Sequence, residues 1–250
     1  MLHQFMKKER IQTLMLAGGL GKRLKDITGG NQPKCFVELQ HNYTAFDYVI
    51  EQLQKIGLTA TWSADNYYYQ YQDLLATIGS DHQMLWQKPG GIVETIRQPG
   101  GTVLAIALDC VFPFKDLPDM IARHEPGTIT WAVTRHSSPE MDGYKGMDVT
   151  PDGAIVGRKD KSITRAPVTI VDTDLLKAFS TVPPSHGEGE NFYFDVLVRI
   201  EQENRRRRLR GERSILNAYF LSGPVIDFGT PTRLFELKPN FQKVYDETNR

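Results

Sequence analysis

Residues 11–24 read IQTLMLAGGLGKRL, a short apolar run that ends in a glycine-rich turn and two cations. The apolar part, Ile11–Ala17, is typical of a buried strand, because it is continuous, short and closed by a turn signal. Glycines let backbone N–H groups approach an anion closely, and cations in the same loop neutralise phosphate charge. The segment therefore predicts a strand that leads into a phosphate-binding loop, which continues to about Lys34.

The two common nucleotide-binding motifs do not fit this loop. The dinucleotide-binding fingerprint requires a third glycine at the position of Leu24. A P-loop requires Ser or Thr after its lysine, whereas Lys22 is followed by Arg23. Neither motif therefore identifies the kind of phosphate-binding loop, and other segments of the sequence are needed to do so.

Strand-like and helix-like patterns alternate along the remaining sequence. We expect strands at 58–63, 102–108, 128–134, 168–171, 214–220 and 224–228, a hairpin of 144–149 with 154–157, and helices at 45–57, 66–78, 116–124, 174–179, 191–204 and from about 231. Such alternation is typical of βαβ units. It predicts an α/β fold with a Rossmann-like, mostly parallel (mixed) central sheet flanked by helices. Because no linker separates two parts, residues 1–250 are expected to form a single domain.

Composition excludes several classes of protein. The 30 Lys and Arg residues balance 30 Asp and Glu residues, so a sequence-independent grip on nucleic acid is not expected. No apolar run reaches the roughly 20 residues of a membrane helix, and no secretory signal pattern follows the first residues. The two cysteines, Cys35 and Cys110, are too few for a disulfide framework. We therefore expect a cytoplasmic protein with no membrane span and no nucleic-acid partner. Both a monomer and a homo-oligomer are compatible with the sequence.

A basic run, Arg205–Arg208, attracts attention but predicts no binding function. It follows a helix that carries Glu201 and Glu203. In a neutral chain such a run is usually a solvated helix face. We expect the same here.

The segment Leu14–Leu39 resembles the signature of the sugar-1-phosphate nucleotidyltransferases, also called nucleoside-diphosphate-sugar pyrophosphorylases. Their pattern is an apolar strand, A-G/A-G-x-G-x-R-L, a short spacer and P-K. The matching residues in this chain are Ala17, Gly18, Gly19, Gly21, Arg23, Leu24, Pro33 and Lys34. The resemblance implies the GT-A-like nucleotidyltransferase fold, with a nucleotide-binding half at about 11–135 and an acceptor-binding half at about 136–235.

Further segments resemble the same family in the same order along the chain. Gln87 and Gly91 match its base-reading segment, Asp109 the acid at the end of its central strand, and Asp227 the acid of its D-x-G-T-P motif. The resemblance also implies an acceptor-binding set, which is Tyr144, Gly146, Asp160, Lys161 and Glu190. The departures from the family pattern are Leu108 in place of Gly, Asp160 in place of Glu, and Pro167 near an expected Gly.

The implied activity is Mg²⁺-dependent transfer of NMP from an NTP to a sugar 1-phosphate, which releases pyrophosphate. Two anions must approach one another, so catalysis consists mainly of positioning and charge neutralisation. Asp109 and Asp227 would hold Mg²⁺, because hard cations prefer carboxylate oxygens. Arg23 would stabilise the leaving pyrophosphate, Lys34 the α-phosphate and Lys161 the incoming phosphate. The family supplies precursors for polysaccharide synthesis.

Two other functions remain open at this point. The departures at Leu108, Asp160 and Pro167 lie toward the acceptor side, so a cytidylyltransferase for a small phosphorylated alcohol, amine or amino acid is an alternative. A second alternative is a nucleotide-binding regulatory protein that has lost turnover. That alternative predicts the loss of a phosphate-binding cation or a metal-binding acid, yet Arg23, Lys34, Asp109 and Asp227 are all present. The sequence leaves the nucleobase open.

Overall fold

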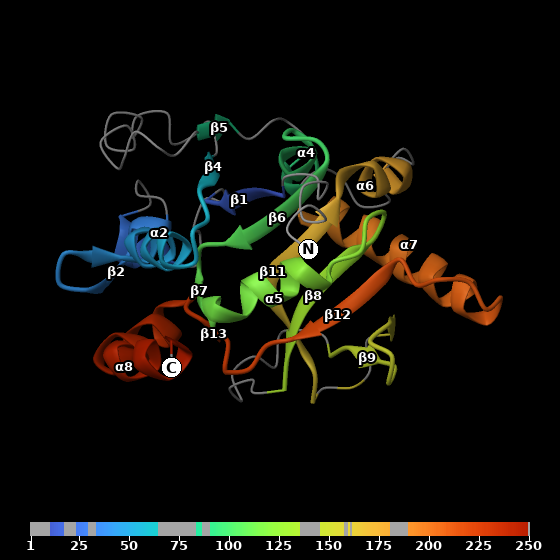
Figure 1. Cartoon of the computed structure of the whole chain (residues 1–250). Coiled ribbons are helices and arrows are strands. Elements are labelled where there is room, and N and C mark those ends of the chain that lie inside the picture. The colour runs from blue at the N-terminus through green and yellow to red at the C-terminus, as the bar shows by residue number, and fades with distance from the viewer. Residues whose placement is uncertain are drawn as a thin grey trace, which may run out of the picture.

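The chain is represented by a computed structural model (Figure 1), which describes residues 11–17, 24–29, 34–64, 84–86, 91–135, 146–157, 160, 162–180 and 190–249. Its central feature is a seven-stranded sheet with helices on both sides. In the described ranges, no helix has the length and apolar character needed to cross a membrane.

The strands of the central sheet lie in the order β12-β8-β11-β6-β1-β4-β5. Parallel pairs join β1 to β4 and β6, β4 to β5, and β8 to β12, whereas β11 runs antiparallel to both of its neighbours. The sheet is therefore mixed and mostly parallel, as the sequence predicts. Its strands are β1 (Gln12–Leu16), β4 (Ala60–Ala64), β5 (Met84–Trp86), β6 (Thr102–Ala107), β8 (Ile129–Thr134), β11 (Thr164–Asp172) and β12 (Leu216–Phe220).

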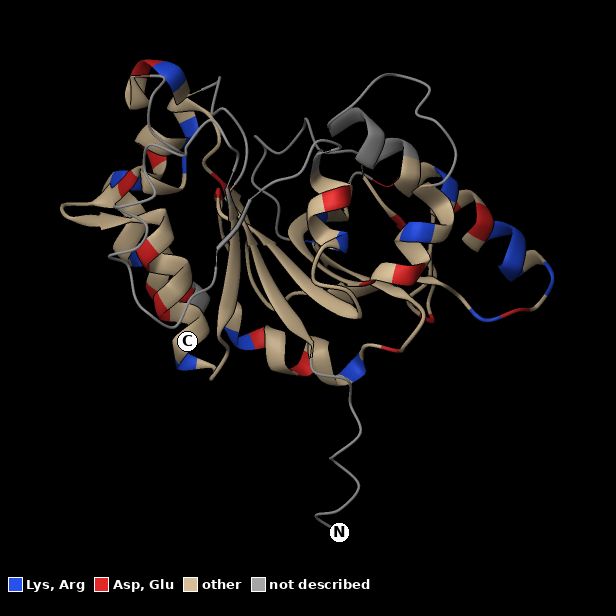
Figure 2. Ribbon diagram, turned by 90° about the horizontal axis from the view of Figure 1, so that it is seen from above, with Lys and Arg blue, Asp and Glu red and all other residues tan. Residues whose placement is uncertain are grey.

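Two hydrophobic cores cover the two faces of this sheet, and Figure 2 shows the helices that close them. Successive side chains of a strand point to opposite faces, so in β6 Val103 and Ala105 enter one core and Leu104 and Ile106 the other. The core that contains Leu104 is packed by α2 (Ala45–Lys55), α5 (Leu117–Arg123) and α8 (Pro231–Asn249). The opposite core is packed by α4 (Gly91–Arg97), α6 (Thr173–Ser180) and α7 (Glu190–Leu209).

Shorter elements connect these layers. Two of them, β7 and β13, form a small ladder beyond the end of β6. The short elements are α1 (Lys25–Thr28), η2 (Lys34–Phe36), β2 (Glu38–Gln40), β3 (Tyr43–Thr44), β7 (Cys110–Val111), η4 (Phe114–Asp116), β9 (Asp148–Val149), β10 (Ile155–Gly157) and β13 (Ile226–Asp227).

The structure corrects some expected boundaries. Strand β11 begins at Thr164 rather than at residue 168, and its pairing with β8 is irregular between Arg165 and Thr169. Pro167 lies in that irregular part, where a residue without a backbone N–H is tolerated. Helix α7 continues to Leu209 instead of ending at residue 204. The helix expected at 66–78 lies outside the described residues.

The basic run at the end of α7 lies on a solvated helix face, as expected, and several of its arginines form ion pairs. Arg206 and Arg210 pair with Glu203, and Arg208 pairs with Asp152. Arg207 and Arg210 also pair with Glu212. Because these pairs are largely exposed, they contribute little to stability.

Asn204 joins helix α7 to two strands. Its side chain is fully buried, and its Nδ2 donates to the carbonyls of Ile155 at 2.7 Å and Leu216 at 3.1 Å. Its Oδ1 accepts from the amide of Ile215 at 2.7 Å and from the Ser214 hydroxyl at 2.9 Å. The side chain thus satisfies the backbone groups at the point where β12 begins.

We expect Asn204→Leu to lower the free energy of unfolding by about 3 kcal/mol, because buried backbone donors and acceptors lose their partner. Urea unfolding at neutral pH measures the change. Asn240→Leu is the matched control, since Asn240 lies exposed on α8 and its side chain donates only to the Glu236 carbonyl among the contacts described for it. Equal losses in the two variants would contradict the role assigned to Asn204.

Candidate functional site

Asp109 lies just beyond the carboxyl end of β6. The chain turns after Ala107 and continues into β7, which pairs antiparallel with β13 so that Cys110 lies opposite Asp227. The Phe228 amide donates to the Asp109 carbonyl at 3.0 Å. This ladder places two acids that are more than a hundred residues apart in sequence beside one another. In open α/β sheets, this end of the strands is where ligands bind.

Lys34, which lies 75 residues before Asp109 in the sequence, also lies at this end of β6. It is the first residue of η2, and the next three residues, Cys35, Phe36 and Val37, are buried in the core beneath it. The ring of Phe36 packs on that of Phe46 in α2, with centroids 5.5 Å apart. This apolar anchor fixes the backbone, so that the Lys34 side chain points toward Asp109.

An ion pair links the lysine to the first acid. Lys34 Nζ donates to Asp109 Oδ2 at 2.5 Å, and the two side chains are 18% and 12% exposed. Burial favours the neutral amine, but the charge of Asp109 and the hydrogen bond to it outweigh burial, with a smaller effect from Asp227. The pKa of Lys34 is therefore raised above its ordinary value, and the lysine is a cation at neutral pH.

Asp227 is held more tightly than the sequence indicated. Its side chain is only 1% exposed, its Oδ2 accepts from Arg233 Nη1 at 2.9 Å, and its Oδ1 accepts from the Gly229 amide at 2.6 Å. Arg233 lies in the first turn of α8, six residues after the acid, and was not predicted as a site residue. The sequence signal nearest to it was the helix start expected near Pro231, which is where α8 begins.

The two cysteines of the site are not reactive thiols. Both are fully buried, and burial raises the pKa of Cys35 to about 12 although the Lys34 charge opposes the shift. Burial, with the charges of Asp109 and Asp227, also raises the pKa of Cys110. Thiols with raised pKa values are poor nucleophiles at neutral pH. Cys35 and Cys110 therefore act as small packing residues.

Three other predicted residues lie at this edge of the sheet. The Ala17 amide donates to the Ser63 carbonyl of β4 at 3.0 Å, and Leu16 before it pairs with Ala107 at the end of β6. Because β11 runs antiparallel to β6, its first residue, Thr164, lies toward the same edge, and Gly146 pairs with it. Asp160 lies in the exposed turn before β11, where its Oδ1 accepts from the amide and hydroxyl of Ser162.

The remaining predicted residues are not joined to this group by a described contact. Gly91 begins α4, and Glu190 begins α7. The others lie outside the described residues, and their assignments stay predictions; they are Gly18, Gly19, Gly21, Arg23, Gln87, Tyr144 and Lys161.

The carboxylates of Asp109 and Asp227 fit a divalent cation that is shared with a substrate. The β7–β13 ladder sets Asp227 opposite Cys110, the residue after Asp109, so the two acids lie close together. Mg²⁺ in phosphate-transfer sites commonly takes one or two carboxylates and completes its coordination with water and substrate phosphates. Among the described residues, no group of three or more His, Cys, Asp or Glu side chains is arranged to hold a metal ion.

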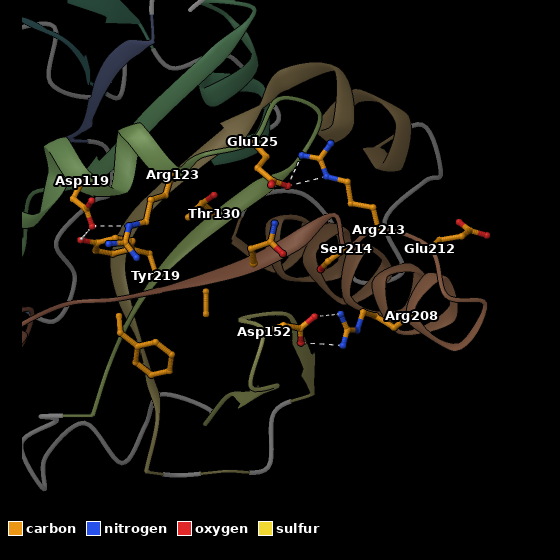
Figure 3. A pocket seen from close by; sticks show the side chains of 13 residues that line it. Asp119, Arg123, Glu125, Thr130, Asp152, Arg208, Glu212, Arg213, Ser214 and Tyr219 are labelled. Carbon is orange, nitrogen blue, oxygen red and sulfur yellow. Dashed lines mark hydrogen bonds and ion pairs between the residues drawn. The ribbon is translucent and has the colours of Figure 1, made fainter.

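A hollow of about 580 Å³ lies beside β12 (Figure 3). Its charged side chains are already paired: Arg123 with Asp119 at 2.9 Å, Arg213 with Glu125, and Arg208 with Asp152. It contains none of the predicted site residues. We therefore assign the candidate site to the edge where Lys34, Asp109 and Asp227 meet.

The chain has the fold of sugar-phosphate nucleotidyltransferases of known structure. It resembles a protein assigned as a glucose-1-phosphate thymidylyltransferase from Bacillus anthracis, in complex with sucrose, at 17% identity and a TM-score of 0.66, with 92% of this chain and 94% of that chain covered. It also resembles the inositol-1-phosphate CTP transferase from T. maritima, at 16% identity, TM-score 0.68 and coverage of 93% and 96%. A third similar structure is HddC from Yersinia pseudotuberculosis, at 16% identity, TM-score 0.64 and coverage of 92% and 99%. No protein-family model and no curated protein matches the sequence.

Proposed function

We propose that the protein is a Mg²⁺-dependent nucleotidyltransferase that joins NMP from an NTP to a phosphorylated small molecule, with a sugar 1-phosphate as the first choice, and releases pyrophosphate. The observation that carries this proposal is the meeting of Lys34, Asp109 and Asp227 at the carboxyl end of β6. Each of these residues also belongs to a sequence motif that resembles the nucleotidyltransferase pattern. The similar fold of two proteins named as nucleotidyltransferases for sugar or inositol phosphates supports the same chemistry.

The residues of the site suit the charge problem of this reaction. The acceptor phosphate must attack the α-phosphate of the NTP, and both groups are anionic. Lys34 is kept protonated beside Asp109, so it would bind a phosphate oxygen and stabilise the charge that develops there. A divalent cation held by Asp109 and Asp227 would neutralise further phosphate charge. The buried Cys35 and Cys110 would take no covalent part.

The acceptor is the open part of this proposal. Gly146 and Asp160 lie at the same edge as Asp109, which supports an acceptor site built from residues after about 136. Asp160 Oδ1 accepts hydrogen bonds from the amide and hydroxyl of Ser162, so a direct contact between Asp160 and the acceptor would use Oδ2. A sugar 1-phosphate is the first choice of acceptor, and a phosphorylated alcohol is the alternative that the assay includes. The reaction implies a cytoplasmic supply of NTP and a role in making activated precursors, such as those of polysaccharides.

A pyrophosphate-release screen tests the proposal. The purified chain is mixed with Mg²⁺, each of the four NTPs, and a panel of sugar 1-phosphates, inositol 1-phosphate and phosphocholine. We expect release with at least one pair, dependent on the acceptor and abolished by a chelator. Nucleotide binding without release across the whole panel would instead favour a regulatory protein.

A further inference from the structure

Each of the two acids at the site is neutralised by a basic side chain. Asp109 pairs with Lys34, and Asp227 pairs with Arg233. The second pair is the more enclosed, because the Asp227 side chain is 1% exposed and that of Arg233 is 17% exposed. Both oxygens of Asp227 are engaged, one by the Gly229 amide and one by the guanidinium. A cation that binds Asp227 Oδ2 must therefore displace the Arg233 guanidinium.

We propose that Arg233 is a positioning residue that closes Asp227 to a free divalent cation, so that the cation binds together with the nucleotide and not before it. This inference rests on the proposed function, because it concerns the same site. It assigns a role to a side chain outside the family motif, since the D-x-G-T-P match ends at Pro231.

The charges of the site explain why the order of binding follows. A divalent cation that displaced Arg233 would leave the guanidinium close to a new double positive charge, in a site with little access to water. A nucleotide triphosphate removes this difficulty, because its phosphates offer the displaced guanidinium an anionic partner. A free cation thus competes with Arg233 for the Asp227 carboxylate. The cation–nucleotide complex instead gives Arg233 a phosphate in place of that carboxylate.

Direct Mn²⁺ binding in the absence of nucleotide tests the inference with a readout other than activity. Electron paramagnetic resonance measures the concentration of free Mn²⁺ while Mn²⁺ is titrated into the wild-type chain or into Arg233→Gln. We expect Arg233→Gln to bind Mn²⁺ about tenfold more tightly, because the competing cation is gone. Adding Asp227→Asn to that variant should remove the gain. Equal or weaker Mn²⁺ binding by Arg233→Gln would overturn the inference.

Arg213→Gln is the matched control, because it breaks an exposed ion pair with Glu125 in which the side chains are 58% and 54% exposed. It should leave Mn²⁺ affinity unchanged. If Arg233→Gln does not fold, the wild-type chain still decides the question. We expect it to bind Mn²⁺ poorly alone and at least about tenfold better with a non-hydrolysable NTP analogue, and tight binding of Mn²⁺ alone would overturn the inference. Failure of the proposed function differs, since it would appear as absent pyrophosphate release across the whole acceptor panel, whatever the Mn²⁺ affinities of the two variants.

Discussion

Replacing Asp109 with asparagine is expected to lower kcat by about a thousandfold or more, while the chain stays folded. Asparagine keeps the size of the side chain and still accepts a hydrogen bond from Lys34, but it removes the negative charge that a divalent cation needs. Since Lys34 then loses the partner that holds its pKa above the ordinary value, we expect a loss of unfolding free energy of no more than about 2 kcal/mol. Steady-state pyrophosphate release and urea unfolding measure the two effects separately.

Asp119→Asn is the matched control for this prediction. Asp119 is a half-exposed acid on α5 that pairs with Arg123 and accepts from the Tyr219 hydroxyl at 2.9 Å. Its replacement should leave kcat unchanged. Turnover by Asp109→Asn within a factor of about three of the wild type would remove Asp109 from the metal-binding assignment.

Lys34→Gln is expected to lower kcat by about a hundredfold to a thousandfold, with a smaller rise in the KM for NTP. The lysine is poised beside Asp109 as a cation, and a charge that acts mainly on the transition state changes kcat more than KM. Glutamine still donates a hydrogen bond but supplies no charge. Initial rates over a range of NTP concentrations separate the two constants.

Lys177→Gln is the matched control for Lys34, since Lys177 is an exposed cation on α6. It should retain wild-type kinetics. A Lys34→Gln variant whose KM rises while kcat is kept would show that Lys34 binds the nucleotide without stabilising the transition state.

The sheet could be predicted because its strands carry strong local patterns. The apolar runs at β1 and β6 are continuous in sequence, so the positions of these strands and the location of Asp109 at a strand end could be predicted. The early start of β11 was missed, because Pro167 hides a strand whose pairing with β8 is irregular at that point. Local pattern alone does not reveal such a pairing.

The candidate site could be predicted in part for a similar reason. Lys34, Asp109 and Asp227 belong to sequence motifs, whereas Arg233 acquires its role only when β13 and the first turn of α8 bring it to Asp227. Asn204 is a comparable case, because its partners lie on β10 and at the start of β12. Side-chain contacts between different helices and strands leave no local pattern in a single sequence.

The fate of the α-phosphate tests the central claim most directly. An NTP labelled at its α-phosphate is incubated with the wild-type chain, Mg²⁺ and the best acceptor of the screen, and the products are separated. We predict that the label appears in a nucleotide joined to the acceptor through a diphosphate, with one pyrophosphate released for each product formed. Label recovered as free NMP, or left in intact NTP that is bound but not consumed, would contradict the account.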